Sequence, residues 1–402
     1  DVCSEVDERT LREIYYRPFE MMVKEANPWS MMCAYNRLNG VYASEHKQLL
    51  QDILRDEWGF DGIIISDWGS VKNRAYSLLA SVEMCMPYQE EAFGQLQEAY
   101  SVGIIDDQIV DAALERLFIF YDRTKTVYEE SVCDFVQHHE IAVEAARKAV
   151  VLLKNENHIL PLDKEKLHKV LVVGEGAVKP YIGGDGSSRV ENMTQVDIPL
   201  EELGRLLGEN VCIEFMGEDK VNAYKNTIGQ METELVEKAS VSDAVIVFVN
   251  GNFASHSEAV DRNTIEIEPN LEHAIKACAR VNKNIIVVLN VGSAVSTYKW
   301  NFCAAGILVS WLGGQGMGKA VAETLCGVNN PSGKLPETFP KRLEDVESLK
   351  NYPGDRHKVV YKEQLMVGYR HFDTSHIQPD YEFGFGLSYS EFEYSDITLE
   401  EN

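Results

Sequence analysis

The sequence predicts an α/β fold in two parts: the last strands of a (β/α)8 barrel, followed by an open, mostly parallel sheet. Two observations support this prediction. Short, wholly apolar runs rich in Ile and Val recur along the chain, as in strands buried on both faces. Helical stretches separate these runs, and this alternation indicates a parallel sheet with crossover helices.

Composition excludes several classes of partner. The chain has 402 residues, so two domains are expected; 45% are hydrophobic, and no apolar run is long enough to cross a bilayer. The formal net charge of −26 disfavours nucleic acid and anionic membrane surfaces, which would be repelled. A neutral small-molecule substrate is compatible with this charge.

The cysteines indicate the redox environment. Eight are scattered without any Cys-x-x-Cys spacing, so we expect buried thiols rather than a zinc site or a disulfide framework. This favours a cytoplasmic location. The sequence begins at Asp1 without a methionine, so we expect it to be a piece of a longer chain, and a signal peptide stays an open alternative.

The first part, residues 1–87, contains about three strands. An amphipathic helix is expected over 4–26, with Ser4 or Asp7 as its cap and a break near Pro18. The following segments are expected in chain order: a strand at "SMMCAYN", a helix over 45–57, a strand at "IIIS", a polar helix over 70–80, and a short strand at "SVEMCMP". Three strands are too few to close an eight-stranded barrel.

Residues 88–150 are predicted to form a helical connector. The adjacent His138 and His139 point about 100° apart on a helix, so we interpret them as solvated or helix-capping rather than metal-binding. The second domain, residues 151–390, is expected to be doubly wound. Its five predicted strands are "KVLVVG", "VCIEFMG", "DAVIVFVNG", "NIIVVLNVG" and "GILVSWLGG".

Asp67 directly follows the buried strand Ile63–Ile65 and Ser66, in "IIISDWGS". It could be a helix N-cap before the next turn. It could equally be a catalytic carboxylate at the carboxyl end of a parallel strand, where α/β barrels place their chemistry. This stretch alone leaves both readings open.

Glu258 follows another predicted strand, in the loop "GNFASHSEAVDR" of the second domain. Taken alone, it could be an ordinary surface carboxylate. Two carboxylates facing one another across a cleft between α/β domains are the catalytic pair typical of glycoside hydrolases. Trp68 would add a flat apolar platform for the C–H face of a sugar ring.

At these residues the chain resembles the β-glucosidases of glycoside hydrolase family 3. The matching phrases are "VDERTLREIYYRPFE", "AYNRLNG", "LRDEWGFDGIIISDWGS", "AVVLLKNENHILPL", "GGDGSS", "NPSGKLPETFP", "VGYRHFD" and "FGFGLSYS". They cover essentially the whole chain in the right order. The resemblance implies a (β/α)8 barrel joined to an (α/β)6 sandwich, with residues 391–402 beginning a fibronectin III-like domain.

The resemblance also implies roles for single residues. Asp67 would be the nucleophile and Glu258 the acid/base, with no cofactor or metal. The sugar-binding residues would be Met32, Tyr35, Trp68 and Ser187.

The sequence departs from the family pattern in two places. The acid/base loop has Ala259 where the family usually has glycine, which makes Glu258 the less secure assignment. The family's barrel residues that bind the sugar hydroxyls have no counterpart in this sequence and would lie upstream of Asp1. A second chain or segment would then be needed to complete the barrel.

We therefore expect hydrolysis of terminal non-reducing β-D-glucosyl residues with retention. The alternatives are another family 3 activity, such as β-xylosidase, α-L-arabinofuranosidase or β-N-acetylglucosaminidase, or a catalytically incomplete sugar-binding fragment. Trp68 after the nucleophile favours a glucosidase by resemblance. A separate Glu258 in the second domain disfavours the glucosaminidase type.

Overall fold

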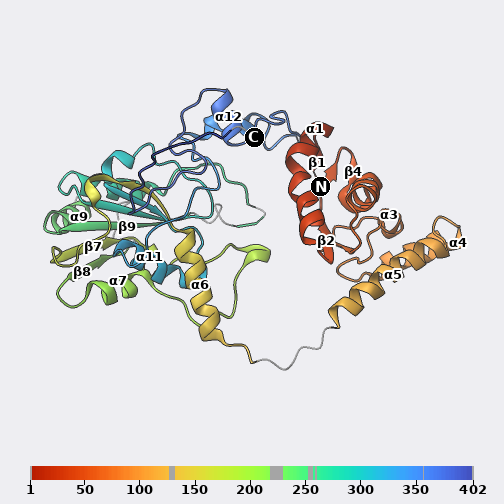
Figure 1. Cartoon of the computed structure of the whole chain (residues 1–402), viewed down its shortest axis with the longest axis horizontal. Coiled ribbons are helices and arrows are strands. Elements are labelled where there is room, and N and C mark those ends of the chain that lie inside the picture. Colours follow the sequence, from red (N-terminus) through yellow and green to blue (C-terminus); the bar gives the residue numbers. More distant parts are fainter. Residues whose placement is uncertain are drawn as a thin grey trace. The chain divides into compact units, whose positions relative to one another are not determined.

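A computed structural model describes residues 2–125, 132–217, 230–251, 257–258, 260–355 and 357–400 (Figure 1). The chain forms two compact units. Unit 1 comprises residues 1–132 and 347–370, and unit 2 comprises 133–346 and 371–402.

Unit 1 contains a parallel strand pair that carries the first candidate carboxylate. Strand β2 (Ser30–Cys33) pairs with β5 (Ile63–Ser66), and Cys33 lies opposite Ser66 at the end of the register. Because the strands are parallel, their carboxyl ends share one edge.

The strand expected at "SVEMCMP" does not form, so that prediction is wrong. Only Met84 makes a bridge, to Ile65. The carboxylate of Glu83 accepts the Ile64 N–H at 2.7 Å, so a side chain takes a bond that a strand ladder would otherwise make.

A second, four-stranded sheet in unit 1 was not expected from the sequence. Its order is β12–β1–β3–β4, with β3 and β4 antiparallel and the other pairs parallel. The strands are β1 (Cys3–Glu5), β3 (Arg37–Leu38), β4 (Val41–Tyr42) and β12 (Lys358–Val360). The helix expected from residue 4 therefore begins only at Glu8. Asp7 is its N-cap and accepts the Thr10 N–H at 3.0 Å.

The helices of unit 1 follow the expected order. The helical stretch is interrupted at Tyr16, between η1 and α2 and close to the expected position, and Pro18 sits in the first turn of α2, where its missing N–H is tolerated. The bounds are α1 (Glu8–Thr10), η1 (Leu11–Tyr15), α2 (Arg17–Met21), η2 (Met22–Ala26), η3 (Ala43–Glu45), η4 (Gln48–Glu57), α3 (Arg74–Leu79), α4 (Glu90–Ser101), α5 (Asp107–Thr124) and η13 (Glu347–Lys350).

Unit 2 is built on a six-stranded sheet of order β6–β11–β10–β9–β7–β8. All five predicted strands are present, and every neighbouring pair is parallel except β6 with β11. The bounds are β6 (Val151–Asn155), β7 (Lys169–Val173), β8 (Cys212–Met216), β9 (Ala244–Asn250), β10 (Ile285–Asn290) and β11 (Gly306–Val309). The prediction of an α/β fold with a mostly parallel sheet is confirmed. Strand β6, an antiparallel edge strand, was not among the strands expected.

Helices cover both faces of this sheet (Figure 1). Residues of α9 and α10 share one apolar core with one face, and residues of α7 and α11 share a second core with the other. The helices are α6 (Phe135–Ala149), α7 (Pro199–Leu207), α9 (Gln230–Ser240), α10 (Pro269–Ala279), α11 (Met317–Leu325) and α12 (Tyr369–Thr374). Single turns lie at η5 (Glu156–His158), η6 (Glu175–Ala177), η7 (Gly186–Ser188), η10 (Asn301–Cys303), η11 (Gly314–Gly316) and η12 (Leu343–Asp345).

One histidine on α6 corrects the interpretation from the sequence. His139 is buried rather than solvated or capping, and its Nε2 lies 3.0 Å from Oδ2 of Asp197. Gln315 Nε2 lies 2.9 Å from Nδ1 of the same ring, and Gln195 Nε2 lies 3.1 Å from its Nε2. The imidazole thus holds α6 to the segments before α7 and α11.

Candidate active site

Asp67 lies one residue beyond the end of β5, at the edge that β5 shares with β2. Its N–H donates to the Cys33 carbonyl at 3.2 Å, and its own carbonyl accepts the Ser66 hydroxyl at 2.9 Å. The Trp68 N–H donates to Oδ1 of Asp67 at 2.6 Å, which orients the carboxylate. The helix-cap alternative is not observed, because α3 is capped by Asn73.

Large side chains surround this edge and remain exposed. Met32 on β2 is 66% exposed, Tyr35 is 45% exposed, and Trp68 is 64% exposed. The Tyr35 hydroxyl donates to the Trp68 carbonyl at 2.6 Å, which ties the two loops together. Exposed flat apolar surface beside a carboxylate suits the C–H face of a pyranose. The structure therefore gathers Met32, Tyr35, Asp67 and Trp68 in unit 1.

The other two candidates meet in unit 2. The Ser187 N–H donates to Oε2 of Glu258 at 2.6 Å, and the Ser187 hydroxyl donates to Oε1 at 2.6 Å. These two bonds, the hydroxyl bond first, lower the pKa of the Glu258 carboxyl below its ordinary value. Ala259, the departure from the family pattern, lies outside the described residues.

The sequence did not predict that Ser187 and Glu258 contact one another. It placed Ser187 against substrate and treated Glu258 separately. Gly186 makes the contact feasible, because its φ is +77° and a Cβ there would lie 2.3 Å from Oε2 of Glu258. The pattern "GGDGSS" signals an unusual backbone, but it gives no indication of the partner.

A positioning residue at the end of β10 was also missed. Asn290 is 1% exposed, and its side chain accepts the Tyr181 N–H at 2.7 Å and donates to the Tyr181 carbonyl at 2.9 Å. It thereby fixes the start of the loop that carries Ser187. The available signal was a polar residue ending an apolar run, as at Asp67.

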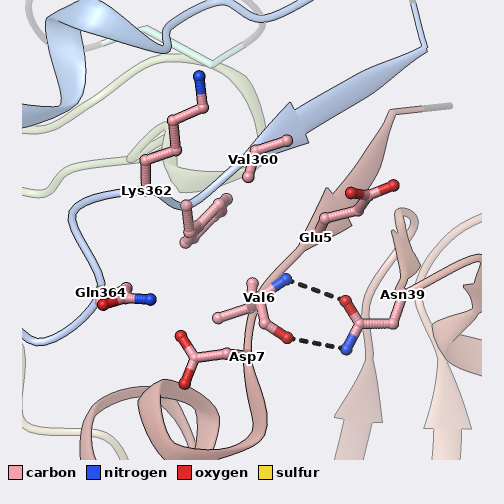
Figure 2. A pocket seen from close by; sticks show the side chains of 8 residues that line it. Glu5, Val6, Asp7, Asn39, Val360, Lys362 and Gln364 are labelled. Carbon is pink, nitrogen blue, oxygen red and sulfur yellow. Dashed lines mark hydrogen bonds between the residues drawn. The ribbon is translucent and has the colours of Figure 1, made fainter.

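Figure 2 shows a polar pocket of about 510 Å³ in unit 1 that contains none of the predicted site residues. Three of its polar side chains, those of Glu5, Asp7 and Asn39, are engaged with neighbouring segments. The Asn39 amide exchanges two 2.9 Å bonds with the N–H and carbonyl of Val6 (Figure 2). Asp7 caps α1, and Glu5 pairs with Lys358. This pocket is therefore a structural junction between β1, β3 and β12 rather than a candidate for the chemistry of the two carboxylates.

Two further properties concern the part of the chain that the structure describes. It contains no group of three or more His, Cys, Asp or Glu side chains arranged to hold a metal ion. No helix within it is long and apolar enough to cross a membrane.

Family models match almost the whole chain. The glycosyl hydrolase family 3 C-terminal domain matches residues 150–389, and the family 3 N-terminal domain matches residues 1–119. The chain belongs to glycosyl hydrolase family 3. The family recognised from the sequence motifs is confirmed.

Curated relatives of this family 3 chain include two activities. Thermostable beta-glucosidase B of Acetivibrio thermocellus is 40% identical, over 98% of the chain and 52% of that protein. An exo-alpha-(1->6)-L-arabinopyranosidase of Bifidobacterium longum is 35% identical, over 99% of the chain and 53% of that protein. The chain thus spans about half the length of these relatives.

Solved structures of family 3 members agree with the fold. The GH3 beta-glucosidase of Bifidobacterium adolescentis matches with a TM-score of 0.86 and 38% identity, over 96% of the chain and 56% of that structure. Beta-glucosidase 3B of Thermotoga neapolitana, solved with alpha-D-glucose, matches with a TM-score of 0.87 and 33% identity, over 99% of the chain and 60% of that structure.

Proposed function

We propose that this family 3 chain acts in a retaining β-glucosidase, with Asp67 as nucleophile and Glu258 as acid/base. The observation that carries the proposal is the position of Asp67 at the carboxyl edge of β2 and β5, beside exposed Trp68. The 40% identity to a thermostable beta-glucosidase over 98% of the chain supports the glucoside as substrate.

In the proposed reaction, a carboxylate oxygen of Asp67 attacks C1 of a terminal β-D-glucosyl residue. The bond between C1 and the leaving oxygen breaks, and Glu258 gives that oxygen its proton. A water then attacks C1 of the glycosyl-enzyme and gives a proton to Glu258, and Asp67 leaves as a carboxylate. Two inversions at C1 give net retention, and no cofactor is required.

Met32, Tyr35, Trp68 and Ser187 would bind the sugar. The Trp68 N–H bonded to Oδ1 supports the nucleophile role of Asp67, because the bond holds the carboxylate in one orientation.

We also propose that another polypeptide segment adds parallel strands to unit 1. Within the described residues β2 pairs only with β5, so its other edge has no strand partner. An apolar pocket of about 190 Å³, lined by residues that include Phe19, Met31, Met32 and Trp58, lies in the same unit. An unpaired edge strand beside exposed apolar surface favours covering by further strands.

This segment can be tested by complementation. The chain alone is expected to turn over aryl β-glucosides weakly or not at all. Adding the part of A. thermocellus beta-glucosidase B that lies outside the matched region is expected to raise turnover. Full turnover by the chain alone would contradict this part of the proposal.

The nucleophile is tested by Asp67→Asn in the preparation that is active. Turnover is expected to be lost with the fold intact, and activity above about a tenth of the parent would exclude the role. A 2-deoxy-2-fluoro glucoside is expected to label the peptide that contains Asp67. Asp52→Asn, on the exposed side of η4, is the matched control and is expected to stay active.

The acid/base is tested by Glu258→Ala. Glucosides with basic leaving groups are expected to suffer far more than activated aryl glucosides, because only the former need the proton. Azide is expected to rescue the activated substrate and to yield β-glucosyl azide. Equal losses on both substrates, with no azide effect, would place the acid/base elsewhere, and Glu266 and Glu268 would be examined next.

A pentopyranoside is the second candidate substrate, because the B. longum relative is named for arabinopyranoside hydrolysis. Comparing kcat/KM on p-nitrophenyl β-D-glucoside, β-D-xyloside and α-L-arabinopyranoside ranks the activities. The β-D-glucoside is expected to lead, and a leading pentoside would replace it as the substrate.

A further inference from the structure

We propose that Ser187 is a positioning residue that fixes both the orientation and the protonation site of Glu258. The inference deepens the proposed function and rests on it for the role of Glu258. The contact itself is a property of the described structure. Two short bonds join the pair, one to each carboxylate oxygen.

The two donors of Ser187 differ in what they permit. A backbone N–H can only donate, so Oε2 of Glu258 must remain an acceptor as long as that 2.6 Å bond persists. A hydroxyl can either donate or accept. A protonated oxygen is the weaker acceptor, so the bond to Oε2 favours a proton on Oε1, where the Ser187 hydroxyl can turn from donor to acceptor without moving its oxygen.

This arrangement matches the two forms that an acid/base passes through. In the ionised form both donors of Ser187 point at the carboxylate, and this is the form that activates water. In the protonated form the bond at Oε1 is reversed, and the proton turns from the Ser187 hydroxyl to the leaving oxygen when it is transferred. The bond from the Ser187 N–H to Oε2 can persist through both steps.

Other charged groups near the pair have partners of their own. On the Ser187 turn, Arg189 pairs with Glu191 at 3.7 Å, and Asp185 also has an interaction. Beyond Glu258, Arg262 donates to the Ala294 carbonyl at 3.0 Å, and Asp261 has an interaction as well. Among the described residues, none forms an ion pair with Glu258. The hydrogen bonds of Ser187 are accordingly the main local influence on this carboxyl.

The experiment follows the Glu258 carboxyl carbon by NMR in the full chain labelled with [δ-¹³C]glutamate, with the resonance assigned by its absence in Glu258→Gln. In the parent, the titration midpoint is expected below that of an ordinary glutamate. Ser187→Ala is expected to raise the midpoint, and Ser187→Thr, which keeps a hydroxyl, is expected to preserve it. The matched control is Ser188→Ala, whose hydroxyl donates to the Asp185 carbonyl instead.

A second variant, at Gly186, tests the same contact with Glu258 by a steric change. In Gly186→Ala the methyl group would lie 2.3 Å from Oε2 of Glu258 and displace the carboxylate, so the midpoint is expected to rise there too. The inference is overturned if Ser187→Ala titrates like the parent, or if Ser188→Ala moves the midpoint as far. The titration needs no turnover, so absence of glycosidase activity would count against the proposed function and not against this contact.

Discussion

Glu83 forms a buried charge cluster behind the strand that presents Asp67. Its side chain is 0% exposed and forms ion pairs with Arg55 Nη2 at 2.9 Å and Arg116 Nε at 2.6 Å. It also accepts the Ile64 N–H of β5 at 2.7 Å. The perturbation we consider is Glu83→Gln, which keeps the shape of the side chain and removes its charge.

The loss of stability depends on which of the two arginines can be hydrated again once Glu83 has lost its charge. The side chain of Arg55 is 6% exposed, whereas that of Arg116 is 23% exposed and can rehydrate. Burial lowers the pKa of Arg55 to about 10, so this guanidinium stays charged at neutral pH and would be left unpaired. Removing one partner of a buried ion pair costs about 3–5 kcal/mol, and the rehydration of Arg116 places this case near the lower end, at roughly 3 kcal/mol.

Native-state hydrogen exchange on the full chain measures this loss at the amides of β5, and it does so without assuming that the two units unfold together. The matched control is Glu57→Gln, which breaks the exposed pair with Arg12 and should cost less than about 1 kcal/mol. Equal losses in the two variants would refute the reasoning. Activity should fall with β5 stability, because Asp67 follows that strand directly.

Three further outcomes are expected. Gly318→Ala should destabilise unit 2 by about 1–3 kcal/mol in thermal unfolding, because its Cβ would lie 2.1 Å from the Asp197 carbonyl oxygen. Gly94→Ala, in open space on α4, should instead stabilise by about 0.5–1 kcal/mol, and the reverse order would refute the packing argument. Hydrogen bonds from the backbone N–H groups of Lys169 and His168 lower the pKa of Asp243. The stability that this carboxylate contributes is therefore present above the ordinary aspartate pKa and is lost as pH falls through the lowered pKa. Asp243→Asn should remove that acid sensitivity in a pH series of urea midpoints. Trp68→Ala should raise KM roughly tenfold, about 1.4 kcal/mol, with a smaller change in kcat, and an unchanged KM would exclude a platform role.

The strands of unit 2 could be predicted because their signal is local. Each central strand is a continuous apolar run, and a run such as Ala244–Asn250 is buried along almost its whole length. Strand β1 could not be predicted in this way. Cys3–Glu5 has no apolar pattern, and its partner Lys358–Val360 lies at the other end of the chain.

The buried His139 was misjudged for a related reason. Adjacent histidines on a helix exclude joint chelation, but that argument does not say which of the two faces the protein. The partners of His139 come from Asp197 and Gln315, which are far apart in the sequence. Only the packing of α6 against α11 reveals that the ring is buried.

Asp67 could be proposed from the sequence because a polar residue that follows an apolar run lies at a sheet edge, whereas Glu258 lies in a loop beyond β9 and was proposed from the resemblance to the family. That signal does not assign their roles, but the hydrogen bonds do support an assignment. Asp67 receives the backbone N–H of Trp68 at 2.6 Å, which fixes the orientation of its carboxylate. Glu258 receives a backbone N–H and, on its other oxygen, a hydroxyl that can reverse. A retaining hydrolase needs one carboxyl group that attacks while ionised and one that alternates between acid and base. The hydroxyl of Ser187 is therefore the feature that favours Glu258, rather than Asp67, for the alternating role.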